Sequence, residues 1–361
     1  MSKQARIVIG SNYGDEGKGT VVAHYTKNSV GSVVNILTNG GAQRGHSILT
    51  EGGSITFKHF GSGTFHGADN YYSRFFILNP MQFVQEYDKL LVKPKHIYRD
   101  RRCLWSTPYD SMANMIMEQK MDRKASCGMG IWNTIKRYRE MQTFPFDDFL
   151  NMSNPEIYLC HVRNYYDKIL GEIPREWKMM WSSHTLQIHF INDCWFMYHN
   201  TELMNDLGSL DYDNYIFENG QGLLLCDTGR DTYDTTPSNT GSLYAAELLK
   251  ELKDVEVTAH YVTRPYLTRH GDGGINGTYD VGRDFISEGI KEDRTNRYNG
   301  FQGKFRYGFL DINGLKDRII DDNKEMFKVE LEVTHCDEMD RINEFKKSFR
   351  NVNTYDSALI K

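Results

Sequence analysis

The chain has 361 residues, of which 39% are hydrophobic and 25% charged, a composition typical of a globular protein with a sizeable core. Its formal net charge of -5 argues against a general nucleic-acid-binding protein, and no apolar run approaches the ~20 residues that would span a bilayer. Its six cysteines include no Cys-x-x-Cys pair and its N-terminus leads directly into an apolar run, so we expect free thiols, no signal peptide and a cytoplasmic protein without nucleic-acid or membrane partners.

The first predicted element is a buried strand over residues 7–9, followed by a glycine-punctuated loop over residues 10–19 and then by a helix. Such a loop binds phosphates, because glycines let backbone N–H groups approach an anion and the helix N-terminus adds positive potential. Lys18 adds a full positive charge. The loop is not a standard P-loop, since Asn12 stands where that motif has glycine and Gly19 where it has serine or threonine.

Two carboxylates, Asp15 and Glu16, lie inside this loop. A carboxylate is unusual in a site built for anions, and it would serve there as a ligand for a metal ion or as a general base. The alternative is a charged surface turn in an ordinary connection between a strand and a helix. The clean strand before the loop favours the functional interpretation.

The rest of the chain alternates strands with helices. We predict strands over residues 32–37, 54–60, 74–78, 215–218, 256–263 and 328–334, and helices over residues 80–91, 108–123 and 241–252 and from residue 338. Residues 145–210 are expected to form a helical cap or layer, and the basic residues 93–102 a solvated face or subunit edge. The pattern predicts an α/β fold: a single large domain over residues 1–361, with a mostly parallel central sheet, a P-loop-like first βα turn and inserted helical regions.

A second glycine-rich loop, residues 38–46, follows the predicted strand over residues 32–37, and residues 219–222 follow the strand over residues 215–218. In open α/β sheets, loops at the carboxyl ends of strands line the ligand crevice, so we expect the first loop and the loop over residues 38–46 to face one site. The hydroxyls and amides of residues 235–240 suit contact with phosphate. A further small-residue loop occupies residues 125–131. The methionines of the helix before it are expected to pack in the core.

One motif in these loops is specific. Gly14-Asp15-Glu16-Gly17-Lys18-Gly19, together with Gly45-His46 at the end of the second strand, resembles the adenylosuccinate synthetase family. Ordered matches to segments of that family cover about residues 7–337. The further matching segments are residues 126–131, 220–224, 236–240, 303–311 and 334–337.

The resemblance implies a reaction in two steps. In that family a 6-oxopurine nucleotide loses its N1 proton and its O6 attacks the γ-phosphate of a nucleoside triphosphate, after which the amino group of aspartate displaces phosphate at C6. By resemblance, Asp15 is the general base, His46 is the acid that stabilises O6 and the transferring phosphoryl group, and Lys18 is a third catalytic group. Because an aspartate with an ordinary pKa of ~3.9 is too weak a base for this proton, we also expect Mg²⁺, held by Asp15 and the backbone carbonyl of Gly45.

The resemblance also implies residues that bind each substrate. For the triphosphate they are Gly14, Glu16, Gly17, Lys18, Gly19, Thr20, Gly45, His46, Ser47, His335 and Asp337. For the purine mononucleotide they are Asp15, Ala23, Asn39, Gln43, Arg44, Ser126, Cys127, Arg137, Arg139, Gln221, Thr236 and Lys304, and for L-aspartate they are Phe301, Gln302, Gly303, Lys304 and Arg306. Arg137 or Arg139 would reach the monophosphate in a partner subunit, which implies a homodimer.

Departures from the family pattern point to one branch. Ala23 replaces an aspartate, Arg44 replaces an alanine, and His335 replaces the lysine that reads a guanine base. In these respects the chain resembles the phage 2-aminoadenylosuccinate synthetases, which implies dGMP as substrate, ATP or dATP as donor, and a role in diaminopurine (2-aminoadenine) DNA synthesis, in the host cytoplasm if the chain is phage-encoded. We hypothesise that Ala23 makes room for the guanine 2-amino group.

Two other functions remain open. An ordinary adenylosuccinate synthetase would act on IMP with GTP, and substrate preference distinguishes it. A nucleotide-binding regulator would keep the fold without the chemistry. The presence of Asp15, Lys18 and His46 argues against a regulator, since a binder needs no general base.

Overall fold

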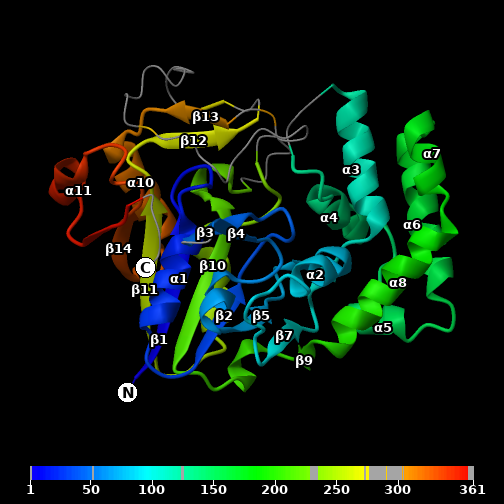
Figure 1. Cartoon of the computed structure of the whole chain (residues 1–361), viewed down its shortest axis with the longest axis horizontal. Helices are drawn as coiled ribbons and strands as arrows, with labels where there is room; N and C mark the ends of the chain where they lie inside the picture. The colour runs from blue at the N-terminus through cyan, green and yellow to red at the C-terminus, as the bar shows by residue number, and fades with distance from the viewer. Residues whose placement is uncertain are drawn as a thin grey trace.

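A parallel β-sheet runs through the centre of the protein (Figure 1). The computed structural model describes residues 2–50, 53–122, 126–227, 235–271, 274–275, 290, 303 and 305–356. In sheet order the strands are β15 (Val352–Thr354), β14 (Lys328–Val333), β11 (Val255–Thr263), β1 (Lys3–Gly10), β10 (Asn214–Gly222), β2 (Val33–Leu37), β5 (Asp69–Tyr72), β7 (Ile97–Asp100) and β9 (Glu202–Met204). Every pairing between them is parallel, which confirms the predicted α/β fold with its mostly parallel sheet.

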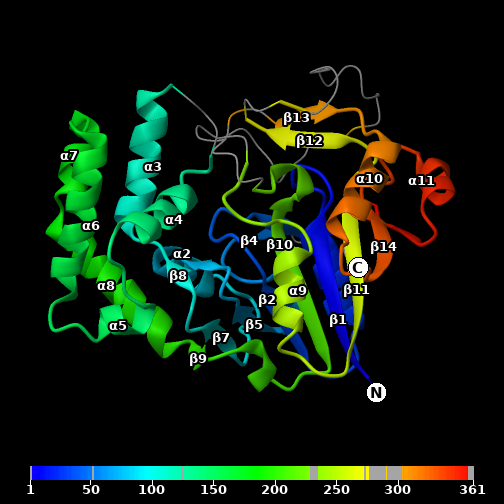
Figure 2. The same ribbon diagram turned by 180° about the vertical axis from the view of Figure 1, so that it is seen from behind.

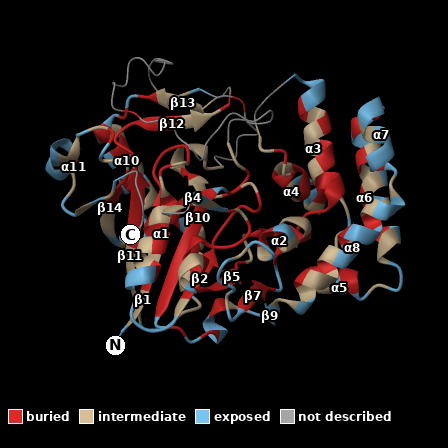
Figure 3. Ribbon diagram, viewed as in Figure 1, coloured by how far each residue is buried: buried red, intermediate tan, exposed pale blue. Residues whose placement is uncertain are grey.

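Helices cover both faces of this sheet. α1 (Lys18–Asn28) lies in front of it in Figure 1, and α9 (Leu243–Leu249) lies in front of β10 when the molecule is seen from behind in Figure 2. Because both faces are covered, the central strands are buried almost continuously, and Ile7, Val8 and Ile9 of β1 are all 0% exposed. Figure 3 shows the sheet as a buried layer between partly exposed helices.

A second group of helices lies beside the sheet, on the side of β7 and β9 (Figure 1). It consists of α2 (Pro80–Tyr87), α3 (Pro108–Lys120), α4 (Ile131–Glu140), α5 (Phe146–Leu150), α6 (Pro155–Leu170), α7 (Arg175–Trp181) and α8 (His184–His199). Trp105 packs against Phe149, Tyr158 and Phe190 in the aromatic core of this group. α5 to α8 fall within the stretch where a helical layer is expected, and the extent of a single domain over residues 1–361 remains a prediction.

The remaining elements complete the rim of the fold. β3 (His46–Thr50) pairs antiparallel with β4 (Gly53–Phe57), β12 (Leu267–His270) pairs antiparallel with β13 (Phe305–Gly308), and β6 (Ile77–Leu78) pairs in parallel with β8 (Leu104–Trp105). The other helices are α10 (Ile312–Asp322) and α11 (Ile342–Ser348), with short 3₁₀ helices at Ser62–His66, Leu207–Ser209 and Leu223–Leu225. None of the helices in the described part of the chain is both long and apolar enough to cross a bilayer.

Some local predictions were wrong. The basic stretch 93–102 is exposed as predicted at Lys93, Lys95, Arg101 and Arg102, but its residues 97–100 form β7, which is buried in the sheet, where Arg99 forms an ion pair with Asp147. β10 continues to Gly222, so residues 219–222 end a strand instead of forming a loop. β5 was not predicted, because its sequence, Asp-Asn-Tyr-Tyr, contains no apolar run. α11 begins at Ile342, four residues later than predicted.

Candidate active site

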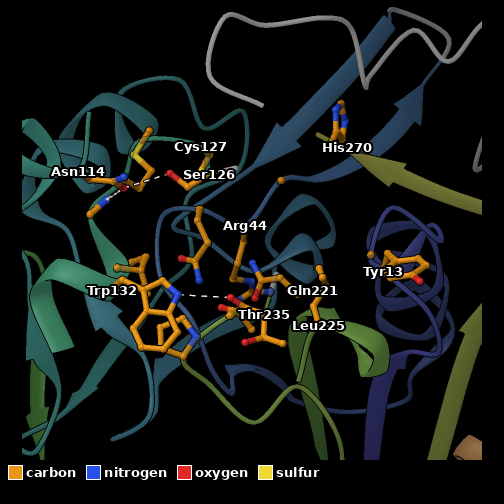
Figure 4. A pocket seen from close by; sticks show the side chains of 18 of the residues that line it. Tyr13, Arg44, Asn114, Ser126, Cys127, Trp132, Gln221, Leu225, Thr235 and His270 are labelled. Atoms are coloured by element: carbon orange, nitrogen blue, oxygen red, sulfur yellow. Dashed lines mark hydrogen bonds between the residues drawn. The ribbon is translucent and has the colours of Figure 1, made fainter. Parts of the chain in front are cut away.

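The glycine-rich loops meet around a cavity of about 280 Å³ (Figure 4). Its wall is formed by the first loop, the loop before β3, part of α3, the loop before α4, the end of β10 with the residues after it, and β12. Of the predicted site residues, the wall includes Gly14, Asp15, Lys18, Gln43, Arg44, Gly45, His46, Ser126, Cys127, Gln221 and Thr236. Segments far apart in the sequence thus share one site, as expected for loops at the carboxyl edge of a parallel sheet.

Glu16 holds the first loop together from inside. Its carboxylate accepts hydrogen bonds from the backbone N–H groups of Asn12 at 2.9 Å and Gly14 at 2.8 Å, and pairs with Lys18 Nζ at 3.0 Å. A Cβ at Gly10 would lie 2.5 Å from this carboxylate, so only glycine leaves room for it. Those two amides are therefore bound to the protein's own anion, so the prediction that the loop amides hold phosphate does not apply to them.

Asp15 has an unusual backbone conformation. Its φ of 59° lies in the left-handed region, which is costly for a residue with a side chain and is concentrated at functional sites. Arg264 Nε donates a hydrogen bond to the Asp15 carbonyl oxygen at 2.7 Å. This contact from the end of β11 stabilises the turn that places Asp15 in the cavity wall.

The surroundings of the Asp15 carboxylate suit a general base. Burial raises its pKa, while the positive charges of His270, Lys18 and Arg264 act against that rise. His270 Nε2 lies 4.0 Å from Asp15 Oδ2. A raised pKa makes the carboxylate a stronger base and the nearby cations favour its ionised form, so Asp15 can accept a proton from a bound substrate.

A buried carboxylate on β10, Glu218, anchors His46. Glu218 is 0% exposed, and its Oε1 accepts a hydrogen bond from His46 Nδ1. Ser62 donates to the same carboxylate from its backbone N–H at 2.9 Å and from its hydroxyl at 2.6 Å. Since Nδ1 is engaged by Glu218, Nε2 is the His46 nitrogen that remains to act on a ligand.

Charge controls the protonation of this pair. Burial and the neighbouring guanidinium of Arg44 lower the pKa of His46, against the opposing effect of Glu218. Burial acts to raise the pKa of Glu218, but the charges of His46 and Arg44 and the hydrogen bonds from His46 and Ser62 lower it. At neutral pH the protein without substrate therefore holds an ionised Glu218 and a neutral His46.

Two side-chain amides in the wall carry buried atoms without partners. Nε2 and Oε1 of Gln43 and Oε1 of Gln221 make no hydrogen bond to any described residue. Gly40 lies between them, and a Cβ there would come within 2.8 Å of Gln43 Nε2 and 3.4 Å of Gln221 Oε1. Buried polar atoms are normally satisfied, so these amides are expected to bind a ligand that offers both donors and acceptors.

The helical group supplies another wall of the cavity (Figure 4). Ser126 Oγ donates to Asn114 Oδ1 at 3.2 Å, and Trp132 Nε1 donates to the Thr235 carbonyl oxygen at 3.3 Å. Burial raises the pKa of the Cys127 thiol to about 11, which keeps it neutral at neutral pH. This wall therefore contributes contacts and shape instead of an ionised nucleophile.

Several wall residues were not predicted individually, although Met129, Gly130, Ile131, Thr235 and Pro237 lie within loops that the sequence singled out. They are Tyr13, Asn114, Met117, Glu118, Met121, Met129, Gly130, Ile131, Trp132, Asn133, Leu225, Thr235, Pro237, Arg269 and His270. Adjacency to the predicted loops could have identified Tyr13 and Trp132. The methionines of α3 were predicted to pack in the core, which is confirmed for Met112, Met115 and Met117, whereas Met121 at the end of the helix is 48% exposed; Met117 and Met121 also line the cavity.

The structure contradicts the prediction that Arg137 could reach a partner subunit. It is 0% exposed, and its guanidinium donates to Asp110 at 2.8 and 3.0 Å, to the Trp105 carbonyl at 3.0 Å and to the Tyr158 hydroxyl at 3.0 Å. It lies on the face of α4 that packs inward, where Asp110 of the α3 capping box offers a buried negative charge. Arg139 lies on the exposed face of the same helix.

Two other predicted residues lie behind the wall and not on it. Ala23 is 0% exposed within an apolar cluster that includes Leu37, Ile48 and Phe60. Asn39 is also 0% exposed, and its side chain bridges Gly220 N at 2.7 Å and Ser238 Oγ at 3.0 Å. Asn39 thereby connects the loop over residues 38–46 to the end of β10. Any effect of Ala23 or Asn39 on a nucleotide in the cavity is therefore indirect in this structure.

The residues expected to bind the triphosphate gather around the start of α1. Thr334, at the end of β14, donates through Oγ1 to the Glu16 carbonyl at 2.6 Å, and His335 Nδ1 lies 2.9 Å from the same hydroxyl. A Cβ at Gly19 would lie 2.9 Å from the Ser47 carbonyl, so β3 packs directly on the helix start. Thr20 is in the first turn of α1, Gly17 precedes that helix at a φ of 92°, and Asp337 follows β14.

The residues expected to bind aspartate lie near β13. Arg306 is opposite Arg269 in the β12–β13 ladder, and the Arg269 guanidinium lies 4.7 Å from the centre of the Tyr13 ring. Like charges placed opposite each other in a ladder are destabilising unless other groups compensate them, and both arginines have interaction partners within the chain. Gly303 is described and Phe301, Gln302 and Lys304 lie outside the described residues.

The donor groups fit Mg²⁺. The Asp15 carboxylate and the Gly45 carbonyl belong to the same wall, and both are hard oxygen ligands. Mg²⁺ is usually held by one or two carboxylates with substrate phosphates and water, so two protein ligands are enough. His260, Glu330 and Glu332 cluster elsewhere, but Glu332 already accepts hydrogen bonds from Tyr25, Tyr355 and Asn353 there, so its oxygens are occupied.

Comparison with known proteins indicates a single family. The model of the adenylosuccinate synthetase family matches residues 7–349. The chain is 24% identical to the adenylosuccinate synthetase of Buchnera aphidicola subsp. Schizaphis graminum over 96% of this chain and 81% of that relative, and 25% identical to that of Geobacter sulfurreducens over 86% and 74%.

Two solved structures share the fold. Fully ligated adenylosuccinate synthetase from Plasmodium falciparum superposes with a TM-score of 0.69 at 18% identity, covering 91% of this chain and 76% of that one. Cyanophage S-2L succinoaminodeoxyadenylate synthetase (PurZ), bound to dGMP and to dATP as an energy donor, superposes with a TM-score of 0.65 at 12% identity, covering 99% and 92%.

Proposed function

Because the chain belongs to the adenylosuccinate synthetase family, and is thus an enzyme that forms a C–N bond, we propose that it joins L-aspartate to C6 of dGMP with hydrolysis of ATP or dATP. The product would be 2-amino-2′-deoxy-N6-succinyladenylate, a precursor for diaminopurine DNA. The observation that carries this proposal is the cavity in which Asp15, the Glu218-anchored His46 and the two unpartnered amides converge.

The amides suit a purine. A 6-oxopurine presents alternating donors and acceptors along its edges, and Gln43 and Gln221 each offer both kinds of group. Their unpartnered atoms are buried in the protein without substrate. A purine that forms hydrogen bonds with these atoms removes the free-energy cost of leaving them unpaired, so the same contacts favour binding and orient the base.

In the first step Asp15 takes the N1 proton. O6 then attacks the γ-phosphorus, so that an O6–P bond forms, the bond from phosphorus to the β,γ-bridging oxygen breaks, and its electron pair leaves on the nucleoside diphosphate. The raised pKa of Asp15 and its neighbouring cations make it a suitable base. Mg²⁺ held by Asp15 and Gly45 would neutralise charge on the phosphates.

His46 would gain its proton only when substrate arrives. In the protein without substrate, burial and Arg44 keep it neutral. The negative charges of two nucleotides offset Arg44 and favour the imidazolium, which Glu218 already orients. His46 would then donate to O6 as charge develops there.

In the second step the amino nitrogen of aspartate attacks C6. The C6–O6 bond breaks and phosphate leaves with O6, while the nitrogen loses a proton. Arg306, which lies opposite the wall residue Arg269 in the β12–β13 ladder, would hold the two carboxylates of aspartate. The homodimer, with Arg139 reaching the partner's monophosphate, is part of the same proposal.

The choice of dGMP over IMP has two supports. The cyanophage enzyme with the same fold is bound to dGMP and dATP, and this chain departs from the family pattern at Ala23 and His335. A second candidate is the ordinary reaction of IMP with GTP, which is favoured by the curated relatives, all of them adenylosuccinate synthetases.

Phosphate release distinguishes these candidates. Purified protein is incubated with Mg²⁺, L-aspartate and ATP, dATP or GTP, with either dGMP or IMP, and the product is identified by mass. Release with dGMP and a succinyl adduct supports the proposal. Turnover of IMP alone, fastest with GTP, would assign the ordinary reaction instead, and nucleotide binding without turnover would indicate a regulator.

A further inference from the structure

Arg44 is buried at the centre of the cavity wall (Figure 4). It is 3% exposed, although it lies on the loop between β2 and β3. Its stem packs on the backbone of Gly220, where a Cβ would come within 3.0 Å of Arg44 Cγ, and its guanidinium lies 6.0 Å from the centre of the Phe76 ring. The guanidinium is therefore held in place before any ligand binds.

Only part of this guanidinium has a partner. Nη2 lies 3.3 Å from Glu218 Oε1 and 3.1 Å from His46 Nδ1. The Glu218 carboxylate also accepts from His46 and Ser62, so its charge is shared among several donors. Nε and Nη1 make no hydrogen bond within the described part of the chain. A buried guanidinium with two unpaired nitrogens would be stabilised by an anionic ligand that reaches it.

The neighbours of Arg44 indicate which anion this is. Its Nη2 lies beside the imidazole of His46, which under the proposed function acts on O6 and the phosphoryl group. Asp15 and Lys18 belong to the same wall. The motif that the chain resembles has alanine at this position, so the charge belongs to this chain and not to the general pattern.

We propose, on the basis of the proposed function, that Arg44 donates from its unpartnered nitrogens to oxygens of the transferring phosphoryl group. It would act in cis on the charge that spreads over the phosphoryl oxygens while the O6–P bond forms and the bond to the bridging oxygen breaks. The nucleoside diphosphate leaves with the electron pair. Arg44 is thereby a catalytic residue of the first step and has no role in the attack of aspartate on C6.

The test isolates the first step. ATP labelled with ¹⁸O in the β,γ-bridge is incubated with Mg²⁺ and dGMP but without aspartate, and positional isotope exchange reports reversible phosphoryl transfer. We expect Arg44→Ala to slow the exchange about 100-fold while the Kd for dGMP, measured by calorimetry, stays within about threefold of the wild type. Added guanidinium should restore part of the exchange in Arg44→Ala.

Controls separate this role from a structural one. Arg44→Lys keeps a charge and should retain more exchange than Arg44→Ala, and melting temperatures show whether each variant is folded. Arg175→Ala, on the exposed surface of α7, should exchange at the wild-type rate. Unchanged exchange in folded Arg44→Ala overturns the proposal. So does a loss of dGMP affinity as large as the loss of exchange, which would assign Arg44 to the monophosphate.

Failure of the proposed function gives a different result. If dGMP supports no exchange in the wild type, IMP is used instead, and exchange with IMP tests Arg44 in the same way while rejecting dGMP. If neither nucleotide supports exchange, the proposed function fails. The affinity of each variant for ATP then shows whether Arg44 contacts the phosphates of ATP. Equal ATP affinity in Arg44→Ala and wild type then rejects Arg44 as a phosphate ligand. A tenfold loss of ATP affinity in Arg44→Ala supports a contact with phosphate but rejects a role in phosphoryl transfer.

Discussion

Glu218 Oε1 accepts a hydrogen bond from His46 Nδ1 inside the cavity wall, although 172 positions separate the two residues in the sequence. Glu218 is fixed in turn by two hydrogen bonds from Ser62. An ionised carboxylate held in this way orients the imidazole and favours its protonated form once the positive charge of Arg44 is offset. Catalysis should therefore depend on a residue that need not touch substrate.

Replacing Glu218 with glutamine tests this dependence. Glu218→Gln keeps the size of the side chain but removes its charge, so protonated His46 loses its stabilising partner. We expect kcat to fall about 100-fold with a much smaller change in the KM for the mononucleotide, as steady-state kinetics would measure. Ser62→Ala, which keeps the charge, should lose less activity. Wild-type kcat in folded Glu218→Gln would contradict the role.

The pH profile should report Asp15. Because burial raises the pKa of Asp15, kcat/KM should rise with pH through a midpoint above the ~3.9 of an ordinary aspartate. The positive charge of His270 acts against this rise, so His270→Ala should move the midpoint to higher pH. His184→Ala, whose side chain is 66% exposed, should leave the profile unchanged. An unshifted or lowered midpoint in His270→Ala would count against the assignment.

Arg137 should matter for stability. Arg137→Met leaves Asp110 buried without its partner, and we expect the free energy of unfolding, measured in urea, to fall by about 3–5 kcal/mol. Adding Asp110→Asn removes the uncompensated charge and should recover part of this loss. Arg139→Ala, on the exposed face of the same helix, serves as the matched control and should unfold like the wild type. Equal stability of Arg137→Met and wild type would show that the buried pair is dispensable.

Arg139 should act between subunits. Arg139→Ala and Asp15→Asn are each expected to be nearly inactive, and mixing the two variants should restore activity, because a mixed dimer contains one site with both residues intact. Light scattering should give the mass of a dimer. A monomer that turns over substrate, or a mixture as inactive as its components, would reject the trans arginine.

Ala23 tests the selectivity for dGMP. An aspartate at this position would place a carboxylate in an apolar cluster behind the cavity, so we expect Ala23→Asp to be less stable and to lose activity with dGMP relative to IMP. Ala23→Val adds bulk without charge and controls for crowding. The ratio of kcat/KM values for dGMP and IMP is the measurement. Full dGMP activity in Ala23→Asp would contradict the hypothesis.

The sequence predicts the local parts of this site well. The strand, glycine loop and helix of the first βα turn are encoded in adjacent residues, and β1 and α1 form there as predicted. β14 likewise begins at Lys328 as predicted, because its apolar residues alternate. These elements follow from periodicity and turn chemistry, which short windows of sequence contain.

Long-range pairing could not be predicted in the same way. Glu218 looks like any polar residue in a strand until β10 is placed beside the loop that carries His46. Arg137 looks like an exposed helical arginine until Asp110 is placed opposite it. The position of Met117 could not be predicted either, because a methionine side chain can pack in a core or line a cavity. In each case the partner, and not the residue, decides the role.

The order of the sheet also constrains how the chain folds during synthesis. β1 carries the start of the phosphate loop at the N-terminus, yet it pairs with β10 and β11, which are translated much later. At 5–20 residues per second, roughly 10–50 s separate β1 from its second partner on the ribosome. Until β10 emerges, Ile7 and Ile9 have neither neighbouring strand of β1 to pair with, so a nascent chain that stops before β10 exposes an apolar strand and should require a chaperone to remain unaggregated.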